Sequence, residues 1–534
     1  MTPAASCRRI SRAVPGDLVV KGDAMRYALT AEAMRAAEDA AVANGATTIT
    51  ELMERAGAAL ASEIGQRWPT GTIVVVCGPG NNGGDGWVAA RLLEEAGRQV
   101  EVLAIREPDE LRAEAARAAA SAIAAGVRWH GVSSVPAVVE TTLAKAVVVV
   151  DAVFGFGFRG PARDTCARVL KAIDACEAPV LSADVPSGVD SDTGAVTAPA
   201  VHADLTVTFN ALKPGLLVFP GEGHAGEVVV ADLGIDATLL QRPDAVMVPE
   251  SADLAGLLPR PLPQDHKGSR GRVAIVAGSA EYPGAAVLAA RGALRMGAGY
   301  VFLVVPDAIA DIARSALPSA IVRAVPSGPD GCLGSADAVL AAVADADAVV
   351  AGPGLGRTPA VGATVRALVA GLSAPLLLDA DALNALSGDR AMLDGRPGPT
   401  LLTPHPGEMA RLLGVDIDEV HADRLGASHR AATHGVTCLL KGPRTVVADA
   451  DRRALVTTGG PELARAGTGD VLSGICGTLL AQGLGPFDAG LLGAFVHGMA
   501  GEHAATRLTS TCVTSSDIPE HLPDAIRSLL GGNE

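Results

Sequence analysis

A glycine-rich stretch near the carboxyl end holds the residues most clearly suited to catalysis. It reads ARAGTGDVLSG and spans residues 464–474. Its small residues let backbone N–H groups converge on an anion, and the apolar segment that follows predicts a helix whose N-terminus adds partial positive charge. Asp470 could then take a proton from a nearby hydroxyl. This pattern is typical of phosphoryl transfer, although a plain helix cap would also place Gly-Asp before an apolar helix.

A second glycine-rich loop, GPGNNGGDG at 78–86, follows a run of β-branched residues. Its glycines satisfy the G-x-G-x-x-G pattern of dinucleotide-binding turns, and Arg106 could receive a 2′-phosphate as in an NADP oxidoreductase. The loop nevertheless carries two amides and a carboxylate, and Asp85 would repel a phosphate unless a cation lay nearby. The residues therefore disfavour the oxidoreductase interpretation.

Two further polar loops belong to the same half of the chain. They are DAVFGFGFRG at 151–160 and ADVPSGVD at 183–190, and each follows a strand-like run. In a parallel sheet, such loops gather at the carboxyl edge together with the loop at 78–86. Each one alone is compatible with a tight turn closed by an Asp cap. Three such loops at one edge of a sheet favour a binding site.

The second half repeats this arrangement with different residues. Glycine turns follow strand-like runs at 278–286 and 352–356, and carboxylates follow another run at 379–384, where they could hold Mg²⁺ through water. His405 lies between two prolines, so it is held stiffly as a ligand contact or as a hydrogen-bonded structural residue. The segment at 441–445, KGPRT, offers a cation and a hydroxyl to nucleotide phosphates.

These loops require parallel strands to position them. Both halves alternate short Val/Ile/Leu runs with Ala-rich helical segments, which is the pattern of parallel α/β sheets covered on both faces. The expected strands are Thr72–Val76, Val100–Ile105, Ala146–Val150, Val180–Ala183, Leu205–Phe209, Glu227–Val230, Arg272–Val276, Tyr300–Val305, Ala348–Ala351, Leu376–Leu378, Thr400–Leu402 and Cys438–Lys441. Trp87–Ala96 and Leu111–Ala125 are expected to be helical.

The length and composition limit the classes of protein. The 534 residues are enough for two α/β domains, each a three-layer sandwich with a mostly parallel sheet. Aromatic residues make up 3%, and 43 basic against 59 acidic side chains give a net charge of −16, which disfavours nucleic acid and anionic membranes as partners. Eight scattered cysteines without metal spacing predict buried, reduced thiols and a cytoplasmic protein.

A proline-rich crossing divides the chain. Pro243, Pro249, Pro259, Pro261 and Pro263 fall within a short stretch that reads as a connection between domains. We expect a flexible leader at 1–26, a first domain at 27–245, a linker at 246–262 and a second domain at 263–534. The halves share no sequence period, so the chain reads as a fusion.

The motifs of the first half closely resemble the YjeF N-terminal domain, the NAD(P)H-hydrate epimerase family, over about residues 27 to 245. They are GPGNNGGDG, the strand end at Asp151, ADVPSGVD, Lys213-Pro214-Gly215 and Phe219-Pro220-Gly221. The resemblance implies a Rossmann-like fold in which Asp184 moves protons and Asn82, Asp151 and Ser187 bind K⁺. The residues it assigns to the hydrated nucleotide are Asn81, Asn82, Gly83, Gly84, Asp85, Gly155, Phe156, Gly157, Phe158, Arg159, Gly160, Pro161 and Asp184.

The second half resembles the ribokinase-like superfamily, and specifically the YjeF C-terminal family of ADP/ATP-dependent NAD(P)H-hydrate dehydratases, over about residues 255 to 530. HKG, GPGLG, LLDADALN, TPHPGE, LKGPRT and AGTGDVLSG stand in family order. The resemblance implies that the hydrate is contacted by Ala285, Gly356, His405 and Asp470. It assigns the adenine nucleotide, ADP or ATP with Mg²⁺, to Lys441, Gly442, Pro443, Arg444, Thr445 and Gly469.

Together the resemblances imply a bifunctional repair enzyme acting on hydrated NADH and NADPH (NADHX and NADPHX). One half would interconvert the R and S hydrates, and the other would dehydrate the S form at the expense of ADP, giving AMP and phosphate, with Asp470 as the base. We also expect a homo-oligomer. The alternative is a small-molecule kinase with a noncatalytic nucleotide-binding first domain, although His405 stands where related vitamin kinases tend to carry an amide.

Overall fold

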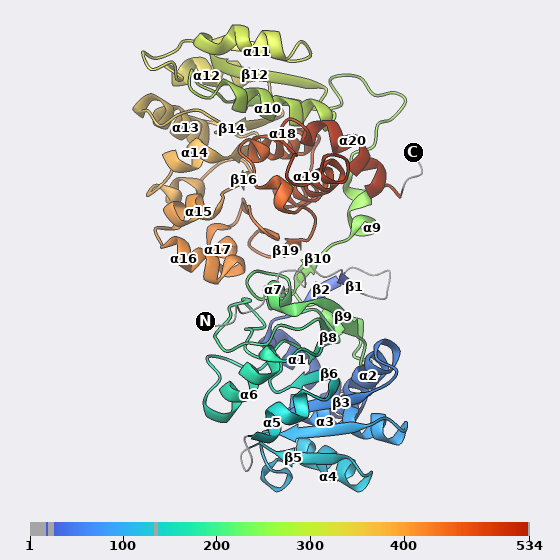
Figure 1. Cartoon of the computed structure of the whole chain (residues 1–534). Coiled ribbons are helices and arrows are strands. Elements are labelled where there is room, and N and C mark those ends of the chain that lie inside the picture. Colours follow the sequence, from blue (N-terminus) through green and yellow to red (C-terminus); the bar gives the residue numbers. More distant parts are fainter. Residues whose placement is uncertain (1–17, 20–25, 133–136, 532–534) are drawn as a thin grey trace, which may run out of the picture. The chain divides into compact units, whose positions relative to one another are not determined.

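The computed structural model describes residues 18–19, 26–132 and 137–531. The chain divides into two compact units, unit 1 (Met1–Val246) and unit 2 (Met247–Glu534), and each is considered by itself (Figure 1). Within the expected leader, Leu18 and Val19 form a short strand paired with Val228 and Val229, and the remaining residues up to 25 lie outside the described part. The domain limits drawn from the sequence stay predictions.

Unit 1 is built on one sheet whose strands follow the order β1-β9-β8-β7-β6-β3-β4-β5, and every neighbouring pair is parallel. Runs of valine and isoleucine form these strands because they are buried on both faces. The strands are β1 (Leu18–Val19), β3 (Thr72–Cys77), β4 (Val100–Ala104), β5 (Arg128–Gly131), β6 (Ala146–Ala152), β7 (Val180–Ala183), β8 (Leu205–Phe209) and β9 (Glu227–Ala231). β2 (Arg26–Ala28) and β10 (Val246–Val248) complete the strands that begin in this unit.

Helices cover both faces of this sheet. Ile73 and Val75 pack in one hydrophobic core with side chains of α1 to α4, whereas Val74 and Val76 pack in another with side chains of α5 and α6. The helices are α1 (Ala31–Ala43), α2 (Ile49–Arg67), α3 (Asn81–Glu95), α4 (Ala113–Ala124), α5 (Ala137–Leu143), α6 (Asp164–Ala175), α7 (Glu222–Ala225) and α8 (Ala237–Leu240). Unit 1 is therefore a three-layer sandwich.

Unit 2 contains a second, mostly parallel sheet. Its strands follow the order β13-β12-β11-β14-β15-β16-β17-β18-β19, parallel as far as β17 and antiparallel from β17 to β19. The strands are β11 (Arg272–Val276), β12 (Tyr300–Pro306), β13 (Ile321–Val325), β14 (Ala348–Ala351), β15 (Leu376–Leu378), β16 (Thr400–Leu402), β17 (Val436–Leu440), β18 (Thr445–Ala448) and β19 (Arg453–Val456).

This sheet is also covered on both faces. Val273 and Ile275 share a core with α10, α18, α19 and α20, and Ala274 and Val276 share another with α12 and α13. The helices are α9 (Ser251–Leu254), α10 (Pro283–Arg295), α11 (Ala310–Ala316), α12 (Ala336–Val343), α13 (Pro359–Gly371), α14 (Ala380–Ala385), α15 (Pro406–Leu413), α16 (Ile417–Ala422), α17 (Arg424–Ala431), α18 (Thr468–Ala481), α19 (Pro486–Leu508) and α20 (Ile518–Leu529). The expected fold class, two α/β sandwiches with mostly parallel sheets, is confirmed.

Some element boundaries differ from the sequence prediction. The helix expected from Trp87 begins at Asn81, so the polar glycine loop forms its first turns. Close packing explains this, because a Cβ at Gly83 would lie 2.0 Å from the carbonyl oxygen of Gly78 and one at Gly86 would lie 2.7 Å from the Cβ of Ala152. The helix expected over Leu111–Ala125 is slightly shorter, because α4 begins at Ala113 and ends at Ala124.

The last predicted strand is also displaced. β17 ends at Leu440, so Lys441 lies just beyond the strand and belongs to the site at its carboxyl end. β18 and β19, which follow in a short antiparallel hairpin, have no counterpart among the predicted strands. Propensity alone does not define such short strands, because cross-strand packing stabilises them.

The cysteines are only partly as expected. Cys77, Cys332, Cys438 and Cys476 are buried thiols, but Cys166 and Cys176 are half-buried and Cys512 is exposed. The prediction of general burial is therefore wrong for these three, and Cys7 lies outside the described residues. Within the described ranges, no helix combines the length and the apolar character needed to cross a membrane.

Candidate active sites

A cavity of about 550 Å³ lies at the carboxyl edge of the sheet in unit 1. Its walls come from the segments that follow β3, β6 and β7, and from α1 and α2. The predicted residues that line it are Asn81, Asn82, Asp85, Gly155, Phe156, Gly157, Phe158 and Asp184. The structure thus brings together three loops that lie far apart in the sequence, as parallel topology requires.

The other predicted substrate contacts do not line the cavity. They are the buried Gly83 and Gly84 and the exposed Arg159, Gly160 and Pro161. Gly84 packs against α2, since a Cβ there would lie 2.6 Å from Cε of Met53.

Asp184 is the most constrained carboxylate of the cavity. Its backbone adopts a left-handed φ of 67°, a strained conformation for a residue with a side chain. One carboxylate oxygen lies 2.6 Å from Nζ of Lys213, and the other accepts a hydrogen bond of 2.9 Å from the backbone N–H of Phe156. The buried ammonium also donates to Oγ1 of Thr208 and to the carbonyl oxygen of Phe209, at 3.0 and 2.9 Å. Asp184 is therefore held in place by a buried cation and a backbone amide.

Replacing Lys213 by Met should destabilise unit 1, because it leaves the Asp184 charge buried without its cation. The expected loss is about 3 to 5 kcal/mol in the free energy of unfolding. Urea denaturation followed by tryptophan fluorescence measures it, because Trp68, Trp87 and Trp129 are the tryptophans of the chain and all belong to unit 1.

The exposed Lys171 on α6 supplies the control for this prediction. Its replacement by Met should change stability by less than about 0.5 kcal/mol. Adding Asp184→Asn to Lys213→Met should restore much of the lost stability. An unchanged unfolding midpoint for Lys213→Met would contradict the role assigned to the pair.

Two more acids share the cavity with Asp184. Burial, together with the nearby carboxylates of Asp184 and Glu38, raises the pKa of Asp85 well above its usual range. Burial also raises the pKa of Glu38 to about 7, against the opposing effect of Lys213. Glu38 was not singled out in the sequence. The sequence feature that could have identified it is an acidic residue at the edge of the apolar face of α1, beside the buried Met34 and Ala41.

The predicted cation ligands meet next to this cavity. The fully buried Asp151 carboxylate accepts hydrogen bonds from the Ser187 N–H at 2.9 Å and from the Ser187 hydroxyl at 2.7 Å. Burial raises the pKa of Asp151, and the hydrogen bonds from Ser187 oppose that shift. A Cβ at Gly155 would lie 3.2 Å from Oδ1 of Asn82, and the buried Nδ2 of Asn82 has no partner. The Asp151 carboxylate accepts from the Val153 N–H at 3.3 Å and the Ser187 hydroxyl from the Phe154 N–H at 2.9 Å, so oxygens of the three side chains lie along the segment from Val153 to Gly155.

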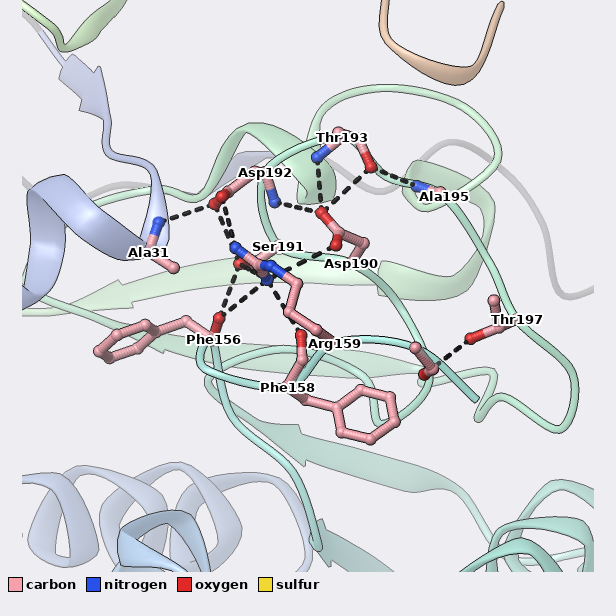
Figure 2. A network of polar contacts seen from close by, with 11 residues as sticks. Ala31, Phe156, Phe158, Arg159, Asp190, Ser191, Asp192, Thr193, Ala195 and Thr197 are labelled. Atoms are coloured by element: carbon pink, nitrogen blue, oxygen red, sulfur yellow. Dashed lines mark hydrogen bonds and ion pairs between the residues drawn. The ribbon is translucent and has the colours of Figure 1, made fainter. Parts of the chain in front are cut away.

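Arg159 fixes the loop that follows β6. As Figure 2 shows, its guanidinium reaches Oδ2 of Asp192 at 2.5 Å, Oγ of Ser191 at 3.3 Å and the carbonyl oxygen of Phe158 at 2.9 Å. Asp192 also accepts a 2.7 Å hydrogen bond from the backbone N–H of Ala31. One network thus joins the loop after β6, the segment after β7 and the start of α1.

In unit 2, the glycine-rich stretch forms the start of α18. Gly467 precedes the helix with a φ of 92°, and no side chain caps the helix N-terminus. The Thr468 hydroxyl donates instead to the carbonyl oxygens of Leu463 and Arg465, both at 2.9 Å. The first amides of this 14-residue helix thus have no side-chain cap, as anion binding requires.

A partly buried ion pair adjoins this helix start. Nζ of Lys441 lies 2.6 Å from Oδ1 of Asp379, and the Ser473 hydroxyl donates to the other oxygen at 2.7 Å. A Cβ at Gly469 would lie 3.2 Å from the same ammonium. Burial lowers the pKa of Lys441, but the carboxylates of Asp379 and Glu408 outweigh burial, so its pKa lies above the usual value. The lysine is therefore a fixed cation beside the predicted phosphate loop.

Asp470 faces the same region from the first turn of α18. Burial and the neighbouring Asp379 raise its pKa to about 7, with Lys441 opposing. Among the described residues, no hydrogen-bond donor contacts its carboxylate. A half-buried carboxylate with a pKa near neutrality suits a general base.

His405 stands at the start of α15 in a reciprocal cap. Its Nδ1 accepts a hydrogen bond of 3.0 Å from the Gly407 N–H, while Glu408 accepts one of 2.8 Å from the His405 N–H. Burial, and then the nearby Lys441 and Arg411, lower its pKa, so the ring is neutral at physiological pH. Nδ1 must therefore be the acceptor, which leaves Nε2 as the donor.

The remaining predicted residues of unit 2 occupy adjoining turns. Gly356 has a φ of 80° and donates its N–H to Asp381 at 2.9 Å. Ala285 approaches the same turn, since a Cβ added at Gly354 would lie 2.8 Å from the Cβ of Ala285. The Asp381 carboxylate and the turn at Gly356 therefore meet beyond the ends of β14 and β15.

The predicted nucleotide loop is shaped by a buried arginine. Arg424 donates to the carbonyl oxygens of Leu440 and Lys441 at 3.4 and 3.3 Å, and burial lowers its pKa to about 10. Arg444 adopts a φ of 55° and donates to the carbonyl oxygen of Thr457. Of this predicted loop, which runs from Lys441 through Gly442 and Pro443 to Thr445, the Lys441 ammonium lies beside the start of α18, while Arg444 already holds a backbone partner.

Unit 1 thus carries a cavity lined by several acids, and unit 2 carries a fixed cation beside an uncapped helix start. These features are typical of an α/β enzyme with two catalytic units that acts on small molecules. Family comparisons agree with this class. A family model described as NAD(P)H-hydrate dehydratase matches residues 273–524, and another described as the YjeF-related protein N-terminus matches residues 49–215.

The chain belongs to the family of bifunctional NAD(P)H-hydrate repair enzymes. It is 38% identical over 491 residues to the repair enzyme of Moorella thermoacetica, covering 90% of this chain and 92% of that relative. It is 35% identical over 475 residues to the enzyme of Escherichia coli, covering 88% of each. An ADP/ATP-dependent NAD(P)H-hydrate dehydratase from Bacillus subtilis aligns with 52% of this chain and 97% of its own at 28% identity and a TM-score of 0.45. Family membership supports the repair enzyme over the small-molecule kinase.

Proposed function

We propose that unit 1 interconverts the R and S hydrates of NADH and NADPH and that unit 2 dehydrates the S hydrate at the expense of ADP, giving AMP and phosphate. The observation that carries the proposal for unit 2 is the fixed Lys441 cation beside an uncapped helix start that also bears Asp470. For unit 1 it is the cavity around the Asp184 carboxylate. The predicted substrate and nucleotide contacts are part of this proposal.

The chemistry of unit 2 converts a poor leaving group into a good one. Asp470 takes the proton of the hydroxyl on the hydrated ring, and the oxygen then attacks the terminal phosphorus of the nucleotide. The amides from Gly467 to Gly469 and the Lys441 ammonium stabilise the negative charge of the transferred group. The phosphate then leaves, the neighbouring ring carbon loses a proton, and the dihydronicotinamide is restored.

Two ions complete the proposal. Asn82, Asp151 and Ser187 would hold K⁺, because carboxylate, hydroxyl and amide oxygens suit a hard cation and the three side chains lie around one backbone segment. That ion would supply positive charge against the buried Asp151. In unit 2, the carboxylates of Asp379 and Asp381 would hold Mg²⁺ through water when a nucleotide is bound, and the ion would neutralise phosphate charge.

The pH dependence of dehydration should follow Asp470. Its pKa of about 7 in the folded protein means that the ionised base is lost as the pH falls through neutrality. We therefore expect kcat/KM for the S hydrate to rise with pH through about 7 and to level off above it. A pH profile from 5.5 to 9 at fixed ADP measures this, and a flat profile across neutrality would rule out Asp470 as the base.

The donor is identified by a direct comparison. Purified S hydrate is incubated with the full chain and Mg²⁺, with ADP and ATP supplied separately, while absorbance reports the dihydronicotinamide and chromatography reports the nucleotide products. The proposal expects faster recovery with ADP and one AMP formed for each NADH. Recovery without any nucleotide, or a stable phosphorylated product, would refute it. Cytoplasmic location and homo-oligomerisation stay predictions.

A further inference from the structure

Glu38 is an acidic residue that lines the cavity of unit 1, and it is not among the predicted site residues. It lies on α1, lines the cavity together with Asp184, and comes from a different wall, since Asp184 follows β7. Within the described ranges, no hydrogen bond or ion pair engages its carboxylate. A half-buried carboxylate without a structural partner, facing a cavity, is available for chemistry.

The helix that carries Glu38 is anchored to the cavity wall. Thr30 caps its first turn by accepting the Ala33 N–H at 3.2 Å, and Asp192 accepts the Ala31 N–H at 2.7 Å. The same Asp192 binds Arg159 of the loop after β6 (Figure 2). Glu38 therefore keeps a fixed place relative to that loop.

Epimerisation of the hydrate needs proton transfer on two sides of one carbon. Enamine hydration places the hydroxyl on the carbon bonded to the ring nitrogen, so inversion can proceed by loss of water to an iminium and return of water to the opposite face. An acid must protonate the departing hydroxyl, and a base must take a proton from the incoming water. Asp184, a carboxylate fixed at the cavity by Lys213, suits the base.

We propose that Glu38 is the second proton-transfer residue of the epimerase, a step that rests on the function proposed for unit 1. The Glu38 carboxyl donates a proton to the hydroxyl, the C–O bond breaks, and the nitrogen lone pair forms the C=N bond. Water then adds to the other face, Asp184 takes its proton, and the C=N electron pair returns to nitrogen. A proton passing from Asp184 to Glu38 through water resets the site, and the reverse reaction exchanges the two roles.

The charges around Glu38 agree with this role. Burial raises its pKa to about 7; Lys213 and Arg35 oppose the shift, while Asp184 and Asp39 reinforce it. Asp85 also interacts with it electrostatically from α3. Near neutral pH, Glu38 is therefore partly protonated and can act as an acid, whereas an ordinary Glu would be ionised.

The test uses purified R hydrate and the full chain without nucleotide, so that only epimerisation occurs, with the R and S forms separated by chromatography. Glu38→Gln should lower kcat at least about 100-fold with KM changed by less than about threefold. Glu38→Asp should keep a measurable rate. In the parent protein the rate should fall as pH rises through about 7, and that fall should be missing from the residual rate of Glu38→Gln.

Controls separate chemistry from folding. Burial already disfavours the charged form of Glu38, so Glu38→Gln should keep the tryptophan-monitored unfolding midpoint of unit 1. Glu32→Gln, an exposed acid on the same helix, should keep full epimerase activity. Activity of Glu38→Gln within threefold of the parent would overturn the inference, as would loss of activity in Asp85→Asn but not in Glu38→Gln. A parent protein without any epimerase activity would instead refute the proposed function itself.

Discussion

Asp470→Asn should lower the rate of S-hydrate dehydration by about 100- to 10,000-fold, the usual contribution of a general base. The amide keeps the shape of the side chain but cannot take the hydroxyl proton. Because Lys441 and the start of α18 remain, nucleotide affinity should change by less than about threefold. The measurements are the return of dihydronicotinamide absorbance with ADP present and the equilibrium binding of ADP.

A matched control comes from the next helix. Asp488 is the third residue of α19, as Asp470 is of α18, and it pairs with Arg452. Asp488→Asn changes the charge at the same helical position and should leave dehydration unaffected. Full dehydratase activity in Asp470→Asn, or an equal loss in both variants, would show that Asp470 is not the base.

Asp184→Asn should abolish epimerisation while leaving dehydration of the S hydrate intact, because the two activities belong to different units. The expected fall in epimerase rate is again about 100- to 10,000-fold. With a mixture of R and S hydrates and ADP, this variant should recover only the S share as NADH. The amount of NADH at the end point measures the effect.

Asp236→Asn serves as the comparison for that variant. Asp236 is an exposed acid that caps α8 in unit 1, so the substitution costs at most about 1 kcal/mol of stability. It should allow complete recovery from the mixture. If Asp184→Asn also recovered the R share at the parent rate, Asp184 would not take part in proton transfer.

The sequence predicted the parallel strands well because their residues are buried on both sides. Runs such as Thr72–Cys77 and Arg272–Val276 consist mainly of β-branched residues and show little alternation of apolar with polar residues, which is typical of strands in parallel sheets. The start of α3 was missed because Asn and Gly are weak helix formers, and tertiary packing against β3 and β6 overrides that propensity. β13, an edge strand with exposed Ile321, lacks the buried pattern.

The loops of both sites were predictable, but their internal pairing was not. Glycine turns after buried runs must meet at the carboxyl edge of a parallel sheet, which is a matter of topology. The pairing of Lys213 with Asp184, and that of Asp379 with both Lys441 and Ser473, depends on side-chain positions at long sequence separation. No local pattern encodes those distances. Glu38 does carry a local signal at the edge of the apolar face of α1, but its place in the cavity depends on how that helix packs in the folded unit.

The most direct test of two activities in one chain is the end point of a mixed substrate. The purified protein is incubated with R and S NADH hydrates, Mg²⁺ and ADP, and the dihydronicotinamide absorbance is followed until it is constant. The account predicts complete recovery of NADH with one AMP formed per molecule. Recovery that stops when the S hydrate is exhausted would contradict the claim that unit 1 supplies the substrate of unit 2.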